Sequence, residues 1–283
     1  MIDLHTHTNA SDGSYTPAEL IEAALHANLE ALAISDHDTF AGYDEAAPVA
    51  ARHGLELIPG VELSTRMASG REYNVHVLGY FLEAPPSFAF RTWLENLVGS
   101  RRERNVKLVE KLRAMGVDIA LPEVEALGRT ITGRPHFARL LVRKGHAANI
   151  EEAFRKYLAE SAPSYVQRRG PPVETGIQQI AAGGGLPVLA HPVRLGVRDR
   201  AAEEALIGKM RDAGLRGLEA YHSDHRPEDV ERYLKLAAKL DLAVTGGTDF
   251  HGSAKPDIAL GTGLRGNVNV PYAVLERLKR TPA

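Results

Sequence analysis

The chain has 283 residues, 44% of them hydrophobic and 25% charged, which is an ordinary composition for a soluble globular protein of one large domain, or one domain with an insertion. It contains no cysteine, so disulfides, thiolate metal sites and thiol nucleophiles are excluded, and any metal must be held by nitrogen and oxygen. No apolar run is long enough to span a bilayer and we infer no signal peptide, so we expect a cytoplasmic protein with no membrane partner and no obligate protein partner.

The near-neutral total charge hides a basic middle segment. Residues 91–169 contain sixteen Lys and Arg against nine Asp and Glu, whereas acidic residues predominate in the remainder of the chain. An acidic body suits cation binding and a basic middle segment suits an anionic substrate, although charges of this kind are also typical of solvated helix faces.

The N-terminal part of the sequence predicts alternating strands and helices. The first strand begins at Ile2, and because alternate residues of a strand point the same way, His5 and His7 at its end can face one point in space. The segment Thr16-Pro17-Ala18-Glu19 is a capping box that predicts a helix to about Ala27. We further predict a helix at Gly42–His53 and strands at Glu30–Ile34, Leu55–Ile58 and Tyr73–Tyr80.

The pattern changes between residues 85 and 172, where only helices are predicted. These helices are Phe88–Met115, Leu121–Leu127, Pro135–Lys144 and Glu151–Leu158. We interpret residues 85–172 as a helical subdomain, the cap, inserted into an α/β body that consists of residues 1–84 and 173–283.

The body then resumes its alternation of strands and helices. The predicted strands are Leu186–Ala190, Gly217–Ala220 and Ala243–Thr245, and the predicted helices are Thr175–Ala182, Arg200–Ala213, Pro227–Leu240 and Tyr272–Lys279. About seven strands separated mostly by helices build either an open sheet or a barrel. Potential ligands follow nearly every strand, and a barrel would gather them in one ring at its C-terminal face, so we favour an incomplete barrel.

Nine side chains at or near the strand ends can bind a metal ion. They are His5, His7, Asp12, His37, Glu62, His76, His191, Asp249 and His251. This number exceeds what one ion requires, so two or three divalent ions that share a bridging carboxylate are the simplest interpretation. Such clusters stabilise the attacking and leaving oxygens of a displacement and lower the pKa of bound water.

The order and approximate spacing of these donors resemble the polymerase and histidinol phosphatase (PHP) family over residues 1–80 and 175–283. The motifs are His-Thr-His at 5–7, Ser-Asp-His at 35–37, Gly-Val-Glu at 60–62, Ala-His-Pro at 190–192 and Asp-Phe-His at 249–251. The resemblance implies a distorted seven-stranded (β/α) barrel with a three-metal phosphoesterase site. Family members often have histidine where this chain has Asp12, which implies a changed metal preference or occupancy there.

The resemblance also implies a role for each donor. The first metal would be held by His5, His7, Glu62 and Asp249, the second by Glu62, His76 and His191, and the third by Asp12, His37 and His251. The reacting group would be a metal-bound hydroxide positioned by Glu62, His191 and Asp249. Manganese is the expected ion, and iron or zinc also fits this mixed ligand set.

The sequence of the cap segment indicates which branch of the family this chain resembles. Residues 132–139 and 163–166 resemble members with an inserted helical cap, namely nucleoside 3′,5′-bisphosphate phosphatases and 5′→3′ exoribonucleases that act on short RNA. We therefore expect a phosphorylated nucleotide or short oligonucleotide as substrate, with conversion of pAp to AMP and phosphate as the main reaction. A histidinol phosphate phosphatase and a non-catalytic, metal-stabilised nucleotide-binding module are the alternatives.

Several residues outside the donor set could bind a second anionic group of the substrate. Arg134 follows a Thr-Gly turn at the start of a helix, a position that can direct its guanidinium and the first helix amides into the cleft. The other candidates are Tyr165, Arg168 and Arg169 in a return loop, and Arg194, His222 and His225 after later strands. His136 in the cap either lines the cleft or packs inside the cap, and the sequence leaves both open.

Overall fold

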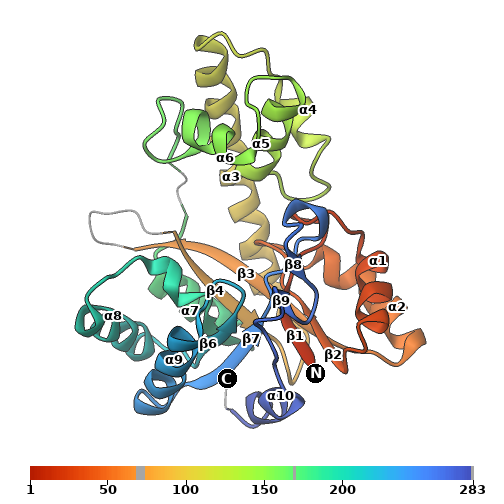
Figure 1. Ribbon diagram of the computed structural model, residues 1–283, viewed down its shortest axis with the longest axis vertical. Helices are drawn as coiled ribbons and strands as arrows, with labels where there is room; N and C mark the ends of the chain where they lie inside the picture. The colour runs from red at the N-terminus through yellow and green to blue at the C-terminus, as the bar shows by residue number, and fades with distance from the viewer. Residues whose placement is uncertain (68–73, 168–169, 282–283) are drawn as a thin grey trace.

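The computed structural model describes residues 1–67, 74–167 and 170–281, and its centre is a seven-stranded sheet with the strands hydrogen-bonded in sequence order (Figure 1). The strands are β1 (Ile2–Thr6), β2 (Ala31–Ile34), β3 (Glu56–Arg66), β4 (Asn74–Tyr80), β5 (Leu186–Leu189), β6 (Gly217–His222) and β7 (Ala243–Gly247). Strand β4 is antiparallel to β3 and β5, and the other neighbours are parallel. Just beyond β7, the Asp249 amide donates to His5 O (2.8 Å) and the His7 amide to Phe250 O (2.9 Å). The sheet is therefore a nearly closed barrel, and the predicted fold class is confirmed.

Strand β3 is longer than predicted, and this changes the position of one donor. The sequence indicated a strand that ends at Ile58, but the structure continues it to Arg66. Residues 60–66 pair antiparallel with β4, which gives the backbone beyond Pro59 a hydrogen-bonding partner. Glu62 consequently lies inside a strand instead of at its exit. Tyr73, the predicted start of the fourth strand, lies outside the described residues.

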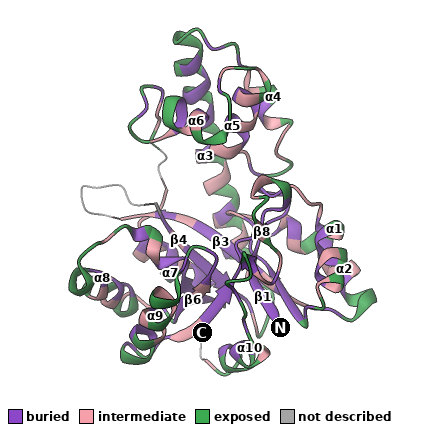
Figure 2. Cartoon of the chain, in the orientation of Figure 1, coloured by how far each residue is buried: buried purple, intermediate pink, exposed green. Residues whose placement is uncertain are grey.

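Helices cover the outside of the barrel. They are α1 (Pro17–His26) and α2 (Ala41–His53) on one side, α7 (Val173–Ala182), α8 (Arg200–Asp212) and α9 (Pro227–Lys239) on the other, and α10 (Tyr272–Leu278) below it in Figure 1. The predicted capping box of α1 is present, because the Glu19 amide donates to Thr16 Oγ1 (3.2 Å) and the Thr16 amide to Glu19 Oε2 (2.7 Å). Figure 2 shows that the strands are largely buried while the outer faces of these helices are exposed.

Short elements complete the body. They are the 3₁₀ turns η2 (Pro192–Leu195) and η3 (Gly252–Ala254) and a small hairpin of β8 (Ile258–Ala259) and β9 (Gly263–Leu264). The hairpin was not predicted, because each of its strands is only two residues long. No described helix is both long and apolar enough to cross a membrane.

The cap is a helical lobe that lies above the barrel in Figure 1 and is joined to it by α3. It contains α3 (Phe88–Ala114), α4 (Leu121–Glu125), α5 (Arg134–Arg143), α6 (Ile150–Ala153) and the π-helix η1 (Phe154–Leu158). The first turns of α3 pack on the barrel through Phe90 and Leu94, and its second half joins the cap's own core, a buried cluster that includes Leu112 and Phe137. The predicted helix Glu151–Leu158 is corrected to α6 and η1, because the Ala159 amide donates to Phe154 O (2.7 Å), five residues back.

Candidate metal centre and adjoining cleft

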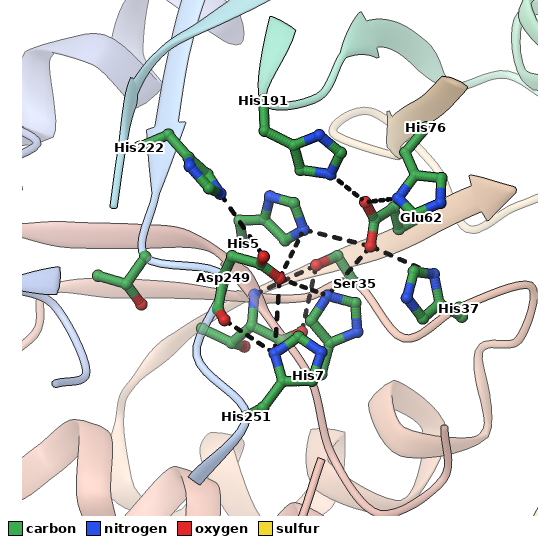
Figure 3. A network of polar contacts seen from close by, with 12 residues as sticks. His5, His7, Ser35, His37, Glu62, His76, His191, His222, Asp249 and His251 are labelled. Atoms are coloured by element: carbon green, nitrogen blue, oxygen red, sulfur yellow. Dashed lines mark hydrogen bonds and ion pairs between the residues drawn. The ribbon is translucent and has the colours of Figure 1, made fainter. Parts of the chain in front are cut away.

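The nine predicted donors converge at one end of the barrel around Glu62, and Figure 3 labels eight of them, all but Asp12. Glu62 Oε2 lies 3.3 Å from His5 Nε2, 3.1 Å from His7 Nε2 and 3.2 Å from His37 Nδ1. Its other oxygen, Oε1, lies 2.7 Å from His76 Nδ1 and 2.9 Å from His191 Nε2. The two oxygens of one carboxylate therefore face two different sets of imidazoles, which is the arrangement expected of a bridging ligand.

Asp249 and Asp12 add two further carboxylates to the cluster around Glu62. Asp249 Oδ1 lies 3.3 Å from His7 Nε2, and the donor atoms of His5, His7, Glu62 and Asp249 are all within 4.8 Å of one another. A second group within the same limit consists of His7, Asp12, His37 and His251, and a third of His37, Glu62 and His76. Asp12 Oδ1 lies 3.2 Å from His251 Nε2.

The donors fit divalent cations. In the part of the chain that the structure describes, His5 Nε2, both ring nitrogens of His7 and His37 Nδ1 are buried without a hydrogen-bond partner. Buried polar atoms are nearly always satisfied, so orphaned nitrogens that converge on carboxylate oxygens suit a cation bound between them. Imidazole and carboxylate donors together suit manganese, iron or zinc.

The protonation states follow from burial and from the opposing charges. Burial alone would raise the pKa of Glu62, but the imidazoles of His76 and His37 hold that pKa well below its usual range, so the carboxylate is ionised. Burial alone would lower the pKa of His7, but its contacts with Asp249 and Glu62 raise this pKa to about 9. Because a metal binds neutral imidazole, loading a cation at His7 must release a proton, and affinity should rise with pH.

Glu219 is a buried carboxylate that the sequence analysis missed. Its Oε1 lies 2.9 Å from His5 Nδ1, and its Oε2 accepts a hydrogen bond from the His191 amide (2.6 Å). One side chain of β6 thereby orients His5 and fixes the backbone that carries His191. The available signal was a single charged residue inside the apolar run of a strand.

We predict that Glu219→Gln weakens metal binding. Glutamine keeps the shape but removes the charge that supports His5, and loss of such an outer partner typically costs roughly 10–100-fold in metal affinity or activity. Manganese titration of the metal-free variant, followed by turnover, measures the effect. Glu56→Gln is the matched control, because Glu56 pairs with Lys279 on the outside of the barrel. Wild-type manganese affinity in Glu219→Gln would contradict the role assigned to this carboxylate.

Two further buried aspartates shape the loops that carry the donors. Asp36 accepts hydrogen bonds from the Thr8 amide (2.8 Å) and the Ser11 hydroxyl (2.6 Å), which holds the loop that leads to Asp12. Asp3 accepts the Thr248 amide (2.9 Å), immediately before Asp249. Asp249 itself has a φ of 57°, in the left-handed region that non-glycine residues rarely adopt and that is concentrated at functional sites.

Two adjoining cavities open onto the donors. The larger, of about 500 Å³, is lined by donor carboxylates and by Arg139, Arg194, Lys255 and Phe154, and the smaller, of about 170 Å³, lies under the cap. Arg194 Nη2 lies 2.9 Å and Lys255 Nζ 2.6 Å from Asp249 Oδ2, so two cations stand beside this donor. Lys255 was not predicted, since it lies in the connection after the last motif.

The predicted substrate-binding residues do not all lie in one cavity. Arg134, Tyr165 and His136 line the smaller cavity, with the Arg134 guanidinium 5.7 Å from the centre of the Tyr165 ring, and Arg194 lines the larger one. Arg168 and Arg169 lie outside the described residues.

His222 and His225 differ from their predicted position on the cleft surface. His222 is buried beside the donors, with Nε2 3.6 Å from Asp249 Oδ2. His225 is buried against Tyr233 and hydrogen-bonded to Ala220 O (2.8 Å). Neither residue is among the described residues that line the two cavities. The pairing of β6 with β7 is irregular between Glu219 and Tyr221, and this shifts the direction of the side chains that follow.

Comparison with known proteins finds relatives over most of the chain. Residues 3–115 match the PHP domain. A 5′-3′ exoribonuclease of Haemophilus influenzae is 34% identical over 250 residues, covering 88% of this chain and 89% of the relative. A 3′,5′-nucleoside bisphosphate phosphatase of Chromobacterium violaceum is 34% identical over 254 residues, covering 88% and 87%. A solved structure from Bifidobacterium adolescentis, assigned as a metal-dependent phosphoesterase, superposes with a TM-score of 0.84 at 33% identity, covering 100% of this chain and 96% of that one.

Proposed function

Because this chain belongs to the PHP family, we propose that it is a metal-dependent phosphoesterase that removes the 3′-phosphate from nucleoside 3′,5′-bisphosphates. The same site would hydrolyse short 5′-phosphorylated oligonucleotides from the 5′ end. The observation that carries the proposal is Glu62, whose two oxygens face separate sets of imidazoles in a cluster of nine donors.

The proposed metal ligands are three sets of donors, of which the first is one of the close groups of donor atoms and the other two follow the family resemblance. His5, His7, Glu62 and Asp249 would hold a first ion, Glu62, His76 and His191 a second, and Asp12, His37 and His251 a third. We propose manganese for these sites, with iron or zinc as chemically equivalent occupants of the same ligand set. When bound, such ions lower the pKa of a coordinated water and neutralise charge on phosphate oxygens.

The chain's own residues bind and orient the substrate. Arg194 and Lys255 place positive charge beside Asp249, where the reacting phosphate would lie, and charge-assisted hydrogen bonds from these groups favour a phosphate dianion. Arg134 and Tyr165 of the cap line the adjoining cavity and would contact the rest of the substrate. Glu219 holds His5 and His191 in position from behind.

The two alternatives are less well supported. Four relatives that match 88% of the chain carry nucleotide-directed or RNA-directed names, which disfavours histidinol phosphate as substrate. A non-catalytic module would need only one structural ion, whereas the donors here exceed that need and open onto a cleft.

A panel of phosphate esters tests the proposal. Metal-free protein reconstituted with manganese should show its highest kcat/KM for adenosine 3′,5′-bisphosphate, with activity also on a 5′-phosphorylated dinucleotide and little on histidinol phosphate. Removal of the metal with a chelator should abolish turnover while a cooperative thermal unfolding transition persists, because catalytic ions are not needed to hold the barrel together. Unfolding on chelation would support a structural site, and a preference for histidinol phosphate would contradict the proposed substrate.

A further inference from the structure

The loop that carries Asp12 is held by the cap as well as by the barrel. The Ile131 amide of the cap donates to Ala10 O (3.0 Å). The Arg129 amide, two residues earlier in the cap, donates to Asn9 O (3.4 Å). Both acceptors lie just before Asp12 in the chain, so the cap constrains the backbone from which this donor projects.

Arg139 adds a side-chain contact at Asp12 itself. This arginine lies in α5, is half-buried and lines the larger cavity, and its Nη2 donates to the Asp12 carbonyl oxygen. Hydrogen bonds from a charged donor are stronger than those between neutral groups. Of the three cap contacts with this loop, the guanidinium contact is therefore the one whose loss should have the largest effect.

Asp12 depends on such support more than the other two donors of its proposed set do. His37 forms a backbone β-bridge with Glu62, and His251 follows directly on β7, so both are placed by the barrel sheet. Asp12 lies in a loop beyond β1, and its Oδ1 and Oδ2 lie 3.2 Å from His251 Nε2 and 3.8 Å from His37 Nε2. Metal ligands must be held close to their productive geometry, so whatever fixes the Asp12 backbone also affects binding at this set.

We propose that Arg139 is a positioning residue for metal binding, which couples the docking of the cap on the barrel to occupancy of the third proposed ion. The coupling rests on the third ion of the proposed function and on no assumption about the substrate. A coupling free energy acts in both directions, so a cation at Asp12, His37 and His251 should in turn stabilise the contact between the cap and the Asp12 loop.

Manganese titration of the metal-free protein by calorimetry, without substrate, tests the proposal. Arg139→Gln should weaken the binding of one of three ions by roughly 10–100-fold and leave the other two affinities at their wild-type values. Arg139→Lys keeps the charge but loses the planar donor group, so it should recover part of the lost affinity, and it serves if Arg139→Gln does not fold. In the wild type, manganese should also slow hydrogen exchange at the Ile131 amide, and this protection should be smaller in Arg139→Gln.

Two further variants separate positioning from a general structural role. Arg143→Gln is the matched control, because Arg143 is exposed at the end of the same helix, and it should leave all three affinities unchanged. In an Asp12→Ala background, Arg139→Gln should cause no further loss of metal, because Arg139 acts through Asp12.

Several results would overturn the coupling. Wild-type affinity for all three ions in Arg139→Gln would do so, and so would an equal loss at all three or a wild type that binds fewer than three. Reduced kcat/KM with every affinity intact would assign Arg139 to the substrate instead. Failure of the wild type to hydrolyse adenosine 3′,5′-bisphosphate would contradict the proposed function alone, since the titration contains no substrate.

Discussion

Replacement of Asp249 by asparagine is expected to lower turnover by more than about a hundredfold. Loss of a residue that only supports a metal ligand lowers affinity or activity by up to about a hundredfold, and loss of a proposed ligand itself should have a larger effect. Asp249 Oδ1 shares a group of donor atoms with His5, His7 and Glu62, and asparagine offers this group a neutral oxygen in place of a charged one. The fold should survive, because asparagine has the same shape and tolerates the φ of 57° found here. His7→Ala, at the opposite end of the chain, should have the same effect on turnover.

The measurement is turnover at saturating manganese, together with metal content and thermal unfolding of the purified variant. Asp224→Asn is the matched control, because Asp224 also pairs with Arg194 (2.7 Å) but belongs to none of the donor groups. Its loss of turnover should be far smaller than that of Asp249→Asn. If Asp249→Asn keeps wild-type turnover at full metal content, the donor set proposed for the first ion is wrong.

The fold class and the donors could be predicted because their signals are local. Most of the barrel strands contain a short apolar run, and a parallel strand brings the residues at its carboxyl end to one end of the barrel regardless of what the rest of the chain does. The capping box of α1 is equally local, since Thr16 and Glu19 satisfy each other's amides. Such features need no knowledge of which distant segment lies alongside.

The supporting carboxylates could not be predicted because their roles depend on distant pairing. Asp3 meets Thr248, and Glu219 meets His5, only once the barrel closes. The predicted end of β3 at Ile58 was wrong for the same reason, because pairing with β4 extends the strand past Pro59. The irregular pairing of β6 likewise turned His222 inward, and no feature of the sequence around it marks that irregularity.

In the cap, some features depend on the local sequence and others on contacts with distant segments. The helical periodicity predicted α3, but not that Arg101 and Arg104 would be buried at the smaller cavity instead of facing solvent, because that depends on how the helix lies against distant segments. The π-helix η1 was missed because one extra residue in a turn leaves the apolar pattern almost unchanged, although it places Phe154 against both cavities.

Glu62→Gln is expected to lower metal content and turnover more than Asp12→Ala does, because Glu62 contacts two sets of imidazoles and Asp12 contacts one. Glu62 is 1% exposed, and its oxygens face His7 on one side and His76 on the other, so a neutral amide in its place disturbs two proposed ions. The amide nitrogen would also direct a donor at one of these sets, which repels a cation. Asp12 contacts His251 and His37 and belongs to one group only.

Metal analysis of both variants separates the two roles. Glu62→Gln should lose about two ions per chain and Asp12→Ala about one. Turnover of Glu62→Gln should be lower than that of Asp12→Ala by about tenfold or more, because a change that disturbs even one metal site lowers affinity or activity by roughly 10–100-fold. Asp12→Asn is the matched comparison for Glu62→Gln, because both replace a carboxylate by its amide, and it should retain more metal than Glu62→Gln. If either Asp12 variant loses more metal than Glu62→Gln, Glu62 is not the bridging ligand, and the group of donors that contains Asp12 holds the cluster together instead.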